Sequence, residues 1–203
     1  MKLSRRWGPQ NLGFDYDVWM NFQQILAWLK FWKTGEADSE DMLHSIVLLL
    51  REARTFSERE LQIAGEKGWG KRFDGTEDPM YFVSKSEVLT VLKAGKYVVQ
   101  LVQVKEPYSD DLEASARNLT RQEQKKAWFE HRAWSSIDLW NGAMSSSRDL
   151  PKKEAYAVLA RFALQLGDAN CSAIYFPKEG WMMPNDGTAE DGLRRLIDAF
   201  PLK

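Results

Sequence analysis

The densest group of side chains that could do chemistry lies in the segment 131–140, which contains His131, Arg132, Trp134 and Asp138. A histidine can titrate near neutral pH, and a carboxylate can accept a proton or a hydrogen bond. Residues two apart share one face of a strand, so Trp134 and Asp138 should point the same way, beside a hydroxyl and a second indole. The segment is therefore a candidate ligand site, with Asp138 as acceptor or base and His131 as its titrating partner.

A structural interpretation of the same residues is favoured over the functional one. His131 and Arg132 would lie near a helix C-terminus, where cations interact well with the helix dipole, and Asp138 would hydrogen-bond a neighbouring loop. Signatures of catalysis are missing elsewhere: the serines at 145–147 lack a Gly-x-Ser-x-Gly elbow, and no glycine motif for phosphate binding occurs. The turn at 185–187 lacks the other ligands of a calcium loop. We therefore expect no cofactor and no metal, and we assign no catalytic residue.

A second candidate functional segment is 14–33, in which apolar residues recur with a period of 3.6 and predict an amphipathic helix with a wide apolar face. Such a helix could cover its own domain, dock on a protein partner or a second copy, or lie on a membrane surface. Its polar side is rich in neutral Asn and Gln, which disfavours the membrane; covering its own domain is the default. The candidate partner-binding residues are its large aromatic side chains Trp19, Phe22, Trp28 and Trp32.

Composition excludes several classes of protein. The chain has 203 residues, with 28 Lys and Arg against 29 Asp and Glu, so its net charge of −1 disfavours general nucleic-acid binding. A single cysteine, Cys171, excludes an intrachain disulfide and favours a reducing compartment. No run of about 18 apolar residues predicts a membrane span, and residues 1–13 lack the apolar core of an export signal. A cytoplasmic location is expected.

Local patterns predict an N-terminal arm and linker over 1–39 and a single domain over 40–203. A continuous apolar run predicts a buried strand, alternation predicts a three-stranded meander, and Ser57 with Glu60 and Thr120 with Glu123 have the spacing of capping boxes. The predicted elements are strands over 45–50, 80–83, 88–92, 97–104, 133–140, 171–176 and 181–183, and helices after Ser57, after Thr120, from Pro151 to Gly167 and from Thr188 to about Phe200. This order predicts an α+β fold, a mainly antiparallel sheet with helices packed on one face.

Five segments resemble, in order, a group of uncharacterised bacterial cytosolic domains of unknown function. They are Ser45-Ile46-Val47-Leu48-Leu49-Leu50-Arg51-Glu52, Ala64-Gly65-Glu66-Lys67-Gly68-Trp69-Gly70, Pro107-Tyr108, His131-Arg132-Ala133-Trp134-Ser135-Ser136-Ile137-Asp138 and Ser172-Ala173-Ile174-Tyr175-Phe176-Pro177. The resemblance spans about residues 44–198. It implies a bacterial cytosolic origin, an α+β fold and a possible site within 131–138, with no activity attached.

The sequence thus favours a non-enzymatic protein-interaction or regulatory binding module, with a protein partner or a homo-oligomer contact, because catalytic sets are missing and tryptophan is abundant. One alternative is a small-molecule-binding protein or hydrolase-like enzyme with a site around His131 and Asp138. Another is a peripheral membrane protein that binds through the N-terminal helix.

Overall fold

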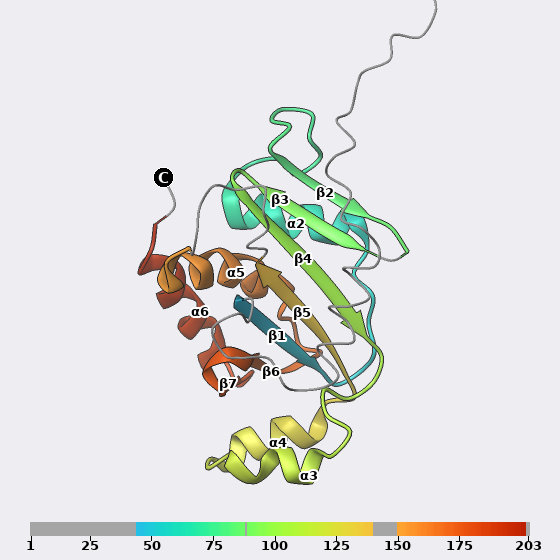
Figure 1. Ribbon diagram of the computed structural model, residues 1–203, viewed down its shortest axis with the longest axis vertical. Helices are drawn as coiled ribbons and strands as arrows, with labels where there is room; N and C mark the ends of the chain where they lie inside the picture. Colours follow the sequence, from blue (N-terminus) through green and yellow to red (C-terminus); the bar gives the residue numbers. More distant parts are fainter. Residues whose placement is uncertain (1–43, 88, 140–149, 202–203) are drawn as a thin grey trace, which may run out of the picture. The chain divides into compact units, whose positions relative to one another are not determined.

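The computed structural model describes residues 44–87, 89–139 and 150–201. Within them the chain forms a seven-stranded sheet in which every neighbouring pair is antiparallel, in the order β2-β3-β4-β5-β1-β6-β7 (Figure 1). The predicted α+β class and antiparallel sheet are confirmed. The predicted N-terminal helix, its four aromatic candidates and the serine loop lie outside the described residues. The predicted boundary after residue 39 also lies outside them and stays a prediction.

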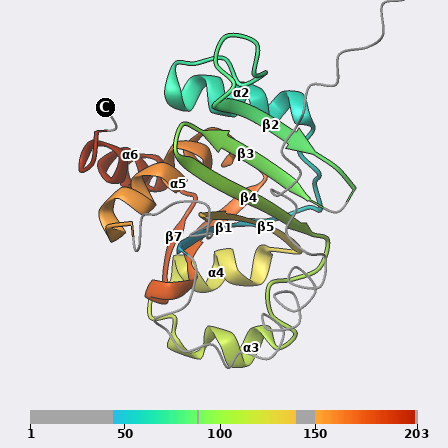
Figure 2. The ribbon, with the colours of Figure 1, turned by 45° about the horizontal axis from the view of Figure 1, so that its top comes forward.

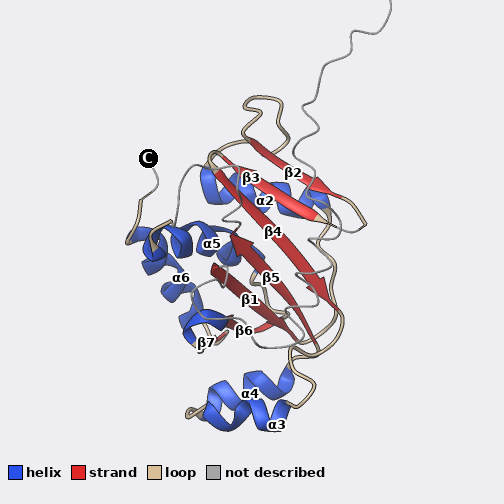
Figure 3. Ribbon diagram, viewed as in Figure 1, coloured by secondary structure: helices blue, strands red, loops and turns tan. Residues whose placement is uncertain are grey.

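Figure 3 distinguishes the strands from the helices. The strands are β1 His44–Leu50, β2 Tyr81–Lys85, β3 Thr90–Ala94, β4 Tyr97–Val104, β5 Ala133–Leu139, β6 Cys171–Phe176 and β7 Trp181–Pro184. The helices are α2 Glu58–Trp69, α3 Leu112–Ser115, α4 Gln122–Glu130, α5 Lys152–Leu166 and α6 Thr188–Asp198. All seven predicted strands in this part of the chain are present.

Helix starts follow local hydrogen bonding, and one prediction about them is wrong. Ser57 and Glu60 form the predicted capping box at the start of α2, which ends at Gly70 with a left-handed φ of 64°. The second predicted box, at Thr120, does not form, because α4 begins two residues later and the side chain of Gln124 accepts from the backbone N–H of Arg121. A glutamine at the third helical position supplied the acceptor that the sequence pattern assigned to glutamate.

The two faces of the sheet are covered by different helices (Figure 2). The main core lies between the sheet and the pair α2 and α5, where Ile46, Leu48 and Phe162 are fully buried. α6 packs on α5 and on β7. α4 packs on the opposite face, over β6 and β7, where the ring of Trp128 meets the ring of Tyr175. The helices are therefore concentrated on one face as predicted, with α4 as an addition on the other.

Both edges of the sheet are protected from pairing with another strand. At the β2 edge, the backbone N–H of Val83 donates to Phe73 O, and Gly75 N–H donates to Tyr81 O. At the β7 edge, Gln124 Nε2 donates to Met182 O at 3.0 Å. Pro184 follows in the same strand and has no N–H to offer. Occupied or missing backbone groups of this kind prevent edge-to-edge association.

Candidate functional site

His131, the predicted titrating residue, is fully buried and bonded to backbone at both ring nitrogens. Its Nε2 accepts from the N–H of Tyr108 at 2.9 Å, and its Nδ1 contacts the carbonyl oxygen of Trp128. Only a neutral ring with the proton on Nδ1 satisfies both contacts. Burial lowers the pKa of His131, which agrees with the neutral form. The imidazole therefore links the loop at Tyr108 to the end of α4.

The ring of Trp128 lies 5.1 Å from this histidine and joins it to a group of aromatic rings. We call this group the aromatic cluster: Tyr108, Trp128, His131, Trp134 and Tyr175. Tyr108 lies in the middle, with its ring centroid 5.4 Å from Trp134 and 5.4 Å from Tyr175, both edge to face. Trp128 completes the group at 5.9 Å from Tyr175. Such edge-to-face pairs stabilise by about 0.5–1.5 kcal/mol each beyond their burial. The rings pack against one another and fill the space between α4 and the sheet.

Asp138, the predicted acceptor, lies on the same face of the sheet and is only 1% exposed. Ser136 Oγ donates to its Oδ2 at 2.8 Å, while Oδ1 has no hydrogen-bond partner among the described residues. Burial raises the pKa of Asp138 to about 6, with the hydroxyls of Ser45 and Ser136 acting in the opposite direction. A carboxyl group in this environment is protonated in a sizeable part of the molecules near pH 6.

The structure brings three of the four predicted residues around Tyr108. The backbone of Tyr108 bonds His131, its ring contacts Trp134, and the charge of Asp138 contributes, after burial and Tyr175, to raising the pKa of its hydroxyl. Arg132 is exposed and donates to the carbonyl oxygens of Phe129 and His131, as a cation does at a helix end. His131 and Asp138 make no hydrogen bond with each other, so the geometry does not provide the expected acid–base pair.

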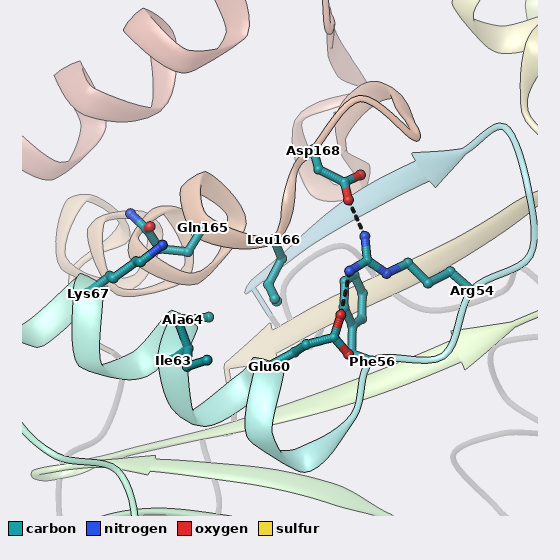
Figure 4. A pocket seen from close by; sticks show the side chains of 9 residues that line it. All are labelled: Arg54, Phe56, Glu60, Ile63, Ala64, Lys67, Gln165, Leu166 and Asp168. Carbon is teal, nitrogen blue, oxygen red and sulfur yellow. Dashed lines mark hydrogen bonds and ion pairs between the residues drawn. The ribbon is translucent and has the colours of Figure 1, made fainter.

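A small pocket of about 150 Å³ lies between α2 and the end of α5, and Figure 4 shows its lining. Arg54 lies there between two carboxylates, with Nη2 at 2.6 Å from Glu60 Oε1 and Nη1 against Asp168. Its guanidinium also covers the ring of Phe56, 4.5 Å from the centroid. Both acidic groups are paired with Arg54, and Lys67 in the same lining brings the positive and negative groups to equal number, so the pocket has no net formal charge to attract an ion.

A larger groove of about 390 Å³ lies between β7 and α6; we call it the α6–β7 groove. Its lining combines apolar side chains of β7, one face of α6 and two arginines: Arg121, Trp181, Met182, Met183, Pro184, Thr188, Gly192, Arg195 and Leu196. Trp181 is 48% exposed and has the most exposed large apolar side chain among the described residues. The buried ring of Phe176, 5.0 Å away, supports its indole from below. The exposed apolar surface of the groove therefore comes mainly from Trp181, with a half-buried Leu196 beside it, because Met182, Met183 and Pro184 are buried.

The two charged residues in the lining of this groove are both arginines. Arg195 donates from Nε to the carbonyl oxygen of Asp191 at 3.3 Å and forms no ion pair with any residue in the described part of the chain. Arg121 has one distant ion pair, 3.9 Å from Glu123, in which both side chains are more than half exposed. Exposed pairs of this kind contribute little, so both guanidinium groups can bind an anion.

Two other side chains that could be reactive, Cys171 and His44, are held in packed surroundings. Cys171 is fully buried, and burial raises the pKa of its thiol to about 12, which makes it inert. The ring of His44 lies 5.3 Å from the ring of Tyr156, whose hydroxyl donates to Glu179. Burial lowers the pKa of His44. Within the described ranges, no three His, Cys, Asp or Glu side chains are grouped so as to hold a metal ion.

Comparisons with known proteins give no match: no protein-family model, no curated protein and no solved structure is similar to the chain. The resemblance to bacterial domains of unknown function therefore stays a prediction. Among residues 44–201, apart from the gaps given above, none of the helices has the length and apolar character needed to cross a membrane.

The α6–β7 groove is a feature that the sequence analysis did not identify. Trp181 was assigned to the predicted strand over 181–183, and residues 188–200 were assigned to a helix, but nothing placed the two side by side. A tryptophan on a short edge strand followed by a strongly amphipathic helix was the available signal. Arg121 comes from a distant part of the chain, and no pattern in the sequence indicated that it would line this groove.

Proposed function

We propose that the chain is a non-enzymatic protein-interaction module and that it binds its partner through the α6–β7 groove. The observation that carries the proposal is the half-exposed indole of Trp181 in a groove with two available guanidinium groups. Tryptophan and arginine are the residues most enriched at the energetic centres of protein interfaces. Met182 and Met183 are buried and form the floor beneath the groove, so Trp181 and Leu196 supply its accessible apolar surface.

The state of the chemistry-bearing residues supports this proposal over the enzyme alternative. His131 uses both ring nitrogens on backbone groups, and Asp138 is 1% exposed. A general base must reach a substrate proton, and neither group has access to one in this arrangement. The membrane alternative depends on residues 14–33, which lie outside the described part, so it receives no support from the fold.

The proposal is tested by photo-crosslinking in the cells that naturally express the protein. p-Benzoylphenylalanine replaces Trp181 in one variant and Phe129, an exposed aromatic residue of α4, in the control. We expect a discrete adduct from position 181 that is absent from position 129. The crosslinked protein is then purified, and Trp181→Ala should weaken its affinity for the full chain by at least about tenfold.

Equal adducts at both positions, or unchanged affinity of the Trp181→Ala chain, would contradict the proposal. Circular dichroism of each variant separates loss of binding from loss of folding, because Trp181 is half exposed and its removal should leave the core intact.

A further inference from the structure

Resting on the proposed function, we infer that the partner of the α6–β7 groove is an acidic peptide segment that inserts a bulky apolar side chain beside Trp181. The inference names the chemistry of the partner from three properties of the groove: its charge, its apolar floor and the closed edge of β7.

The first property is charge. Arg121 comes from the start of α4 and Arg195 from α6, and both line the groove. Asp186, on the β7–α6 turn, accepts from the N–H and the hydroxyl of Thr188, and the charge of Arg121 also helps to lower its pKa. Arg121 therefore has this carboxylate within electrostatic range, with which it forms no ion pair, and Arg195 carries the second positive charge. A segment with Asp or Glu would pair with both guanidinium groups without displacing a buried ion pair.

The second property is the apolar floor between these charges. Met182, Met183 and Leu196 lie beside Trp181, and Gly192 of α6 contributes no side chain. A Cβ at Gly192 would approach Met183 Sδ to 2.4 Å, so the close contact of α6 with β7 depends on this glycine. The resulting volume of about 390 Å³ is large enough for one or two aliphatic or aromatic side chains.

The third property is that a peptide cannot extend the sheet here. Met182 O already accepts from Gln124, and in an antiparallel strand the N–H of the same residue points to the same side. Pro184, the next residue on that side, has no N–H. A single free N–H is too little for strand addition, so side chains must supply recognition.

The test selects binders from a random peptide library displayed on phage, with the full chain as the target. We expect enriched peptides to carry Asp or Glu on both sides of a Leu, Phe, Trp or Met. Their affinity for the chain should fall at least about tenfold when salt is raised from about 0.05 to 0.5 M, as rim ion pairs are screened.

Matched variants separate the inference from the proposed function. The double variant Arg121→Glu/Arg195→Glu should lose affinity for the acidic peptides at least about tenfold and gain it for the same peptides with lysine at the acidic positions. The control, Arg117→Glu/Lys153→Glu, makes the same charge change at two exposed residues outside the groove lining and should leave affinity within about twofold.

If Trp181→Ala abolishes binding while charge reversal has no effect, the acidic partner is wrong and the groove stands as the binding surface. If neither variant changes the affinity, or if no peptide is enriched, both the inference and the proposed function are overturned.

Discussion

The aromatic cluster and the α6–β7 groove lie on neighbouring parts of the same sheet, yet they use similar side chains in opposite ways. In the cluster, Trp128 and Trp134 are at most 7% exposed, and His131 has both ring nitrogens bonded. In the groove, Trp181 is 48% exposed, and Arg195 has no ion pair within the described residues. Residue type alone does not identify a site, because the same kinds of side chain serve packing in one region and are available for binding in the other.

His131→Ala should produce the largest loss of stability. A small loss would contradict the packing role that the comparison assigns to the aromatic cluster. Removing the buried ring leaves a cavity and deprives Tyr108 N–H and Trp128 C=O of their partner. We expect the free energy of unfolding to fall by about 3–4 kcal/mol, measured by urea unfolding with far-UV circular dichroism. The neighbouring exposed residue provides the control, since Arg132→Ala should cost under about 1 kcal/mol. A stable His131→Ala protein would indicate a ring kept for function.

Asp138→Asn should have the next largest effect, in the stabilising direction. The pKa of Asp138 is raised by burial to about 6, above the value of about 3.9 in an unfolded chain. The folded state therefore binds more protons than the unfolded state between pH 4 and 6, and this carboxyl lowers stability progressively as the pH rises through that window. The neutral amide removes the penalty, so the variant should exceed the natural chain by up to about 3 kcal/mol near pH 7.5.

Urea unfolding of both chains from about pH 4 to 8 measures this difference directly, and the contribution of His131 cancels in it. An advantage of the variant that did not grow with pH, or that reversed near neutrality, would show that Asp138 is ionised and compensated by a group with which it acts.

Trp181→Ala and Arg195→Ala should have the smallest effects on stability, and this contrast sharpens the comparison. Both side chains are largely outside the packed core, so each change should alter the free energy of unfolding by less than about 1 kcal/mol. The same variants should lose partner binding. Calorimetry of thermal unfolding measures this for both variants. A shift of the unfolding temperature as large as that of His131→Ala would contradict the expectation.

The sequence predicted the strands well because each one carries its own local pattern. The run at 46–50 is apolar on both faces and forms an interior strand of the sheet, where these residues are at most 1% exposed. The alternation over 97–104 forms β4 with the same bounds. Helix starts were harder to predict, because Ser57 and Thr120 had the same spacing but only the first forms a cap.

The functional surface could not be predicted in the same way. Trp134 and Asp138 both lie on β5, where the alternation placed them, but the surroundings of His131 and Asp138 depend on Tyr108 in a distant loop. The α6–β7 groove combines Arg121, Trp181 and Arg195 from three elements. Such a combination is set by tertiary packing, to which no periodicity in the sequence corresponds.

The position of β1 inside the sheet, between β5 and β6, has a consequence for synthesis of the chain. Its neighbours β5 and β6 come much later, and the bond from Ser172 Oγ to Leu49 O spans 123 residues. During translation this apolar strand therefore remains unpaired on both of its edges until most of the remaining polypeptide has emerged from the ribosome. We expect the chain to fold slowly and to require chaperone protection during translation. Nascent chains arrested before residue 171 should aggregate.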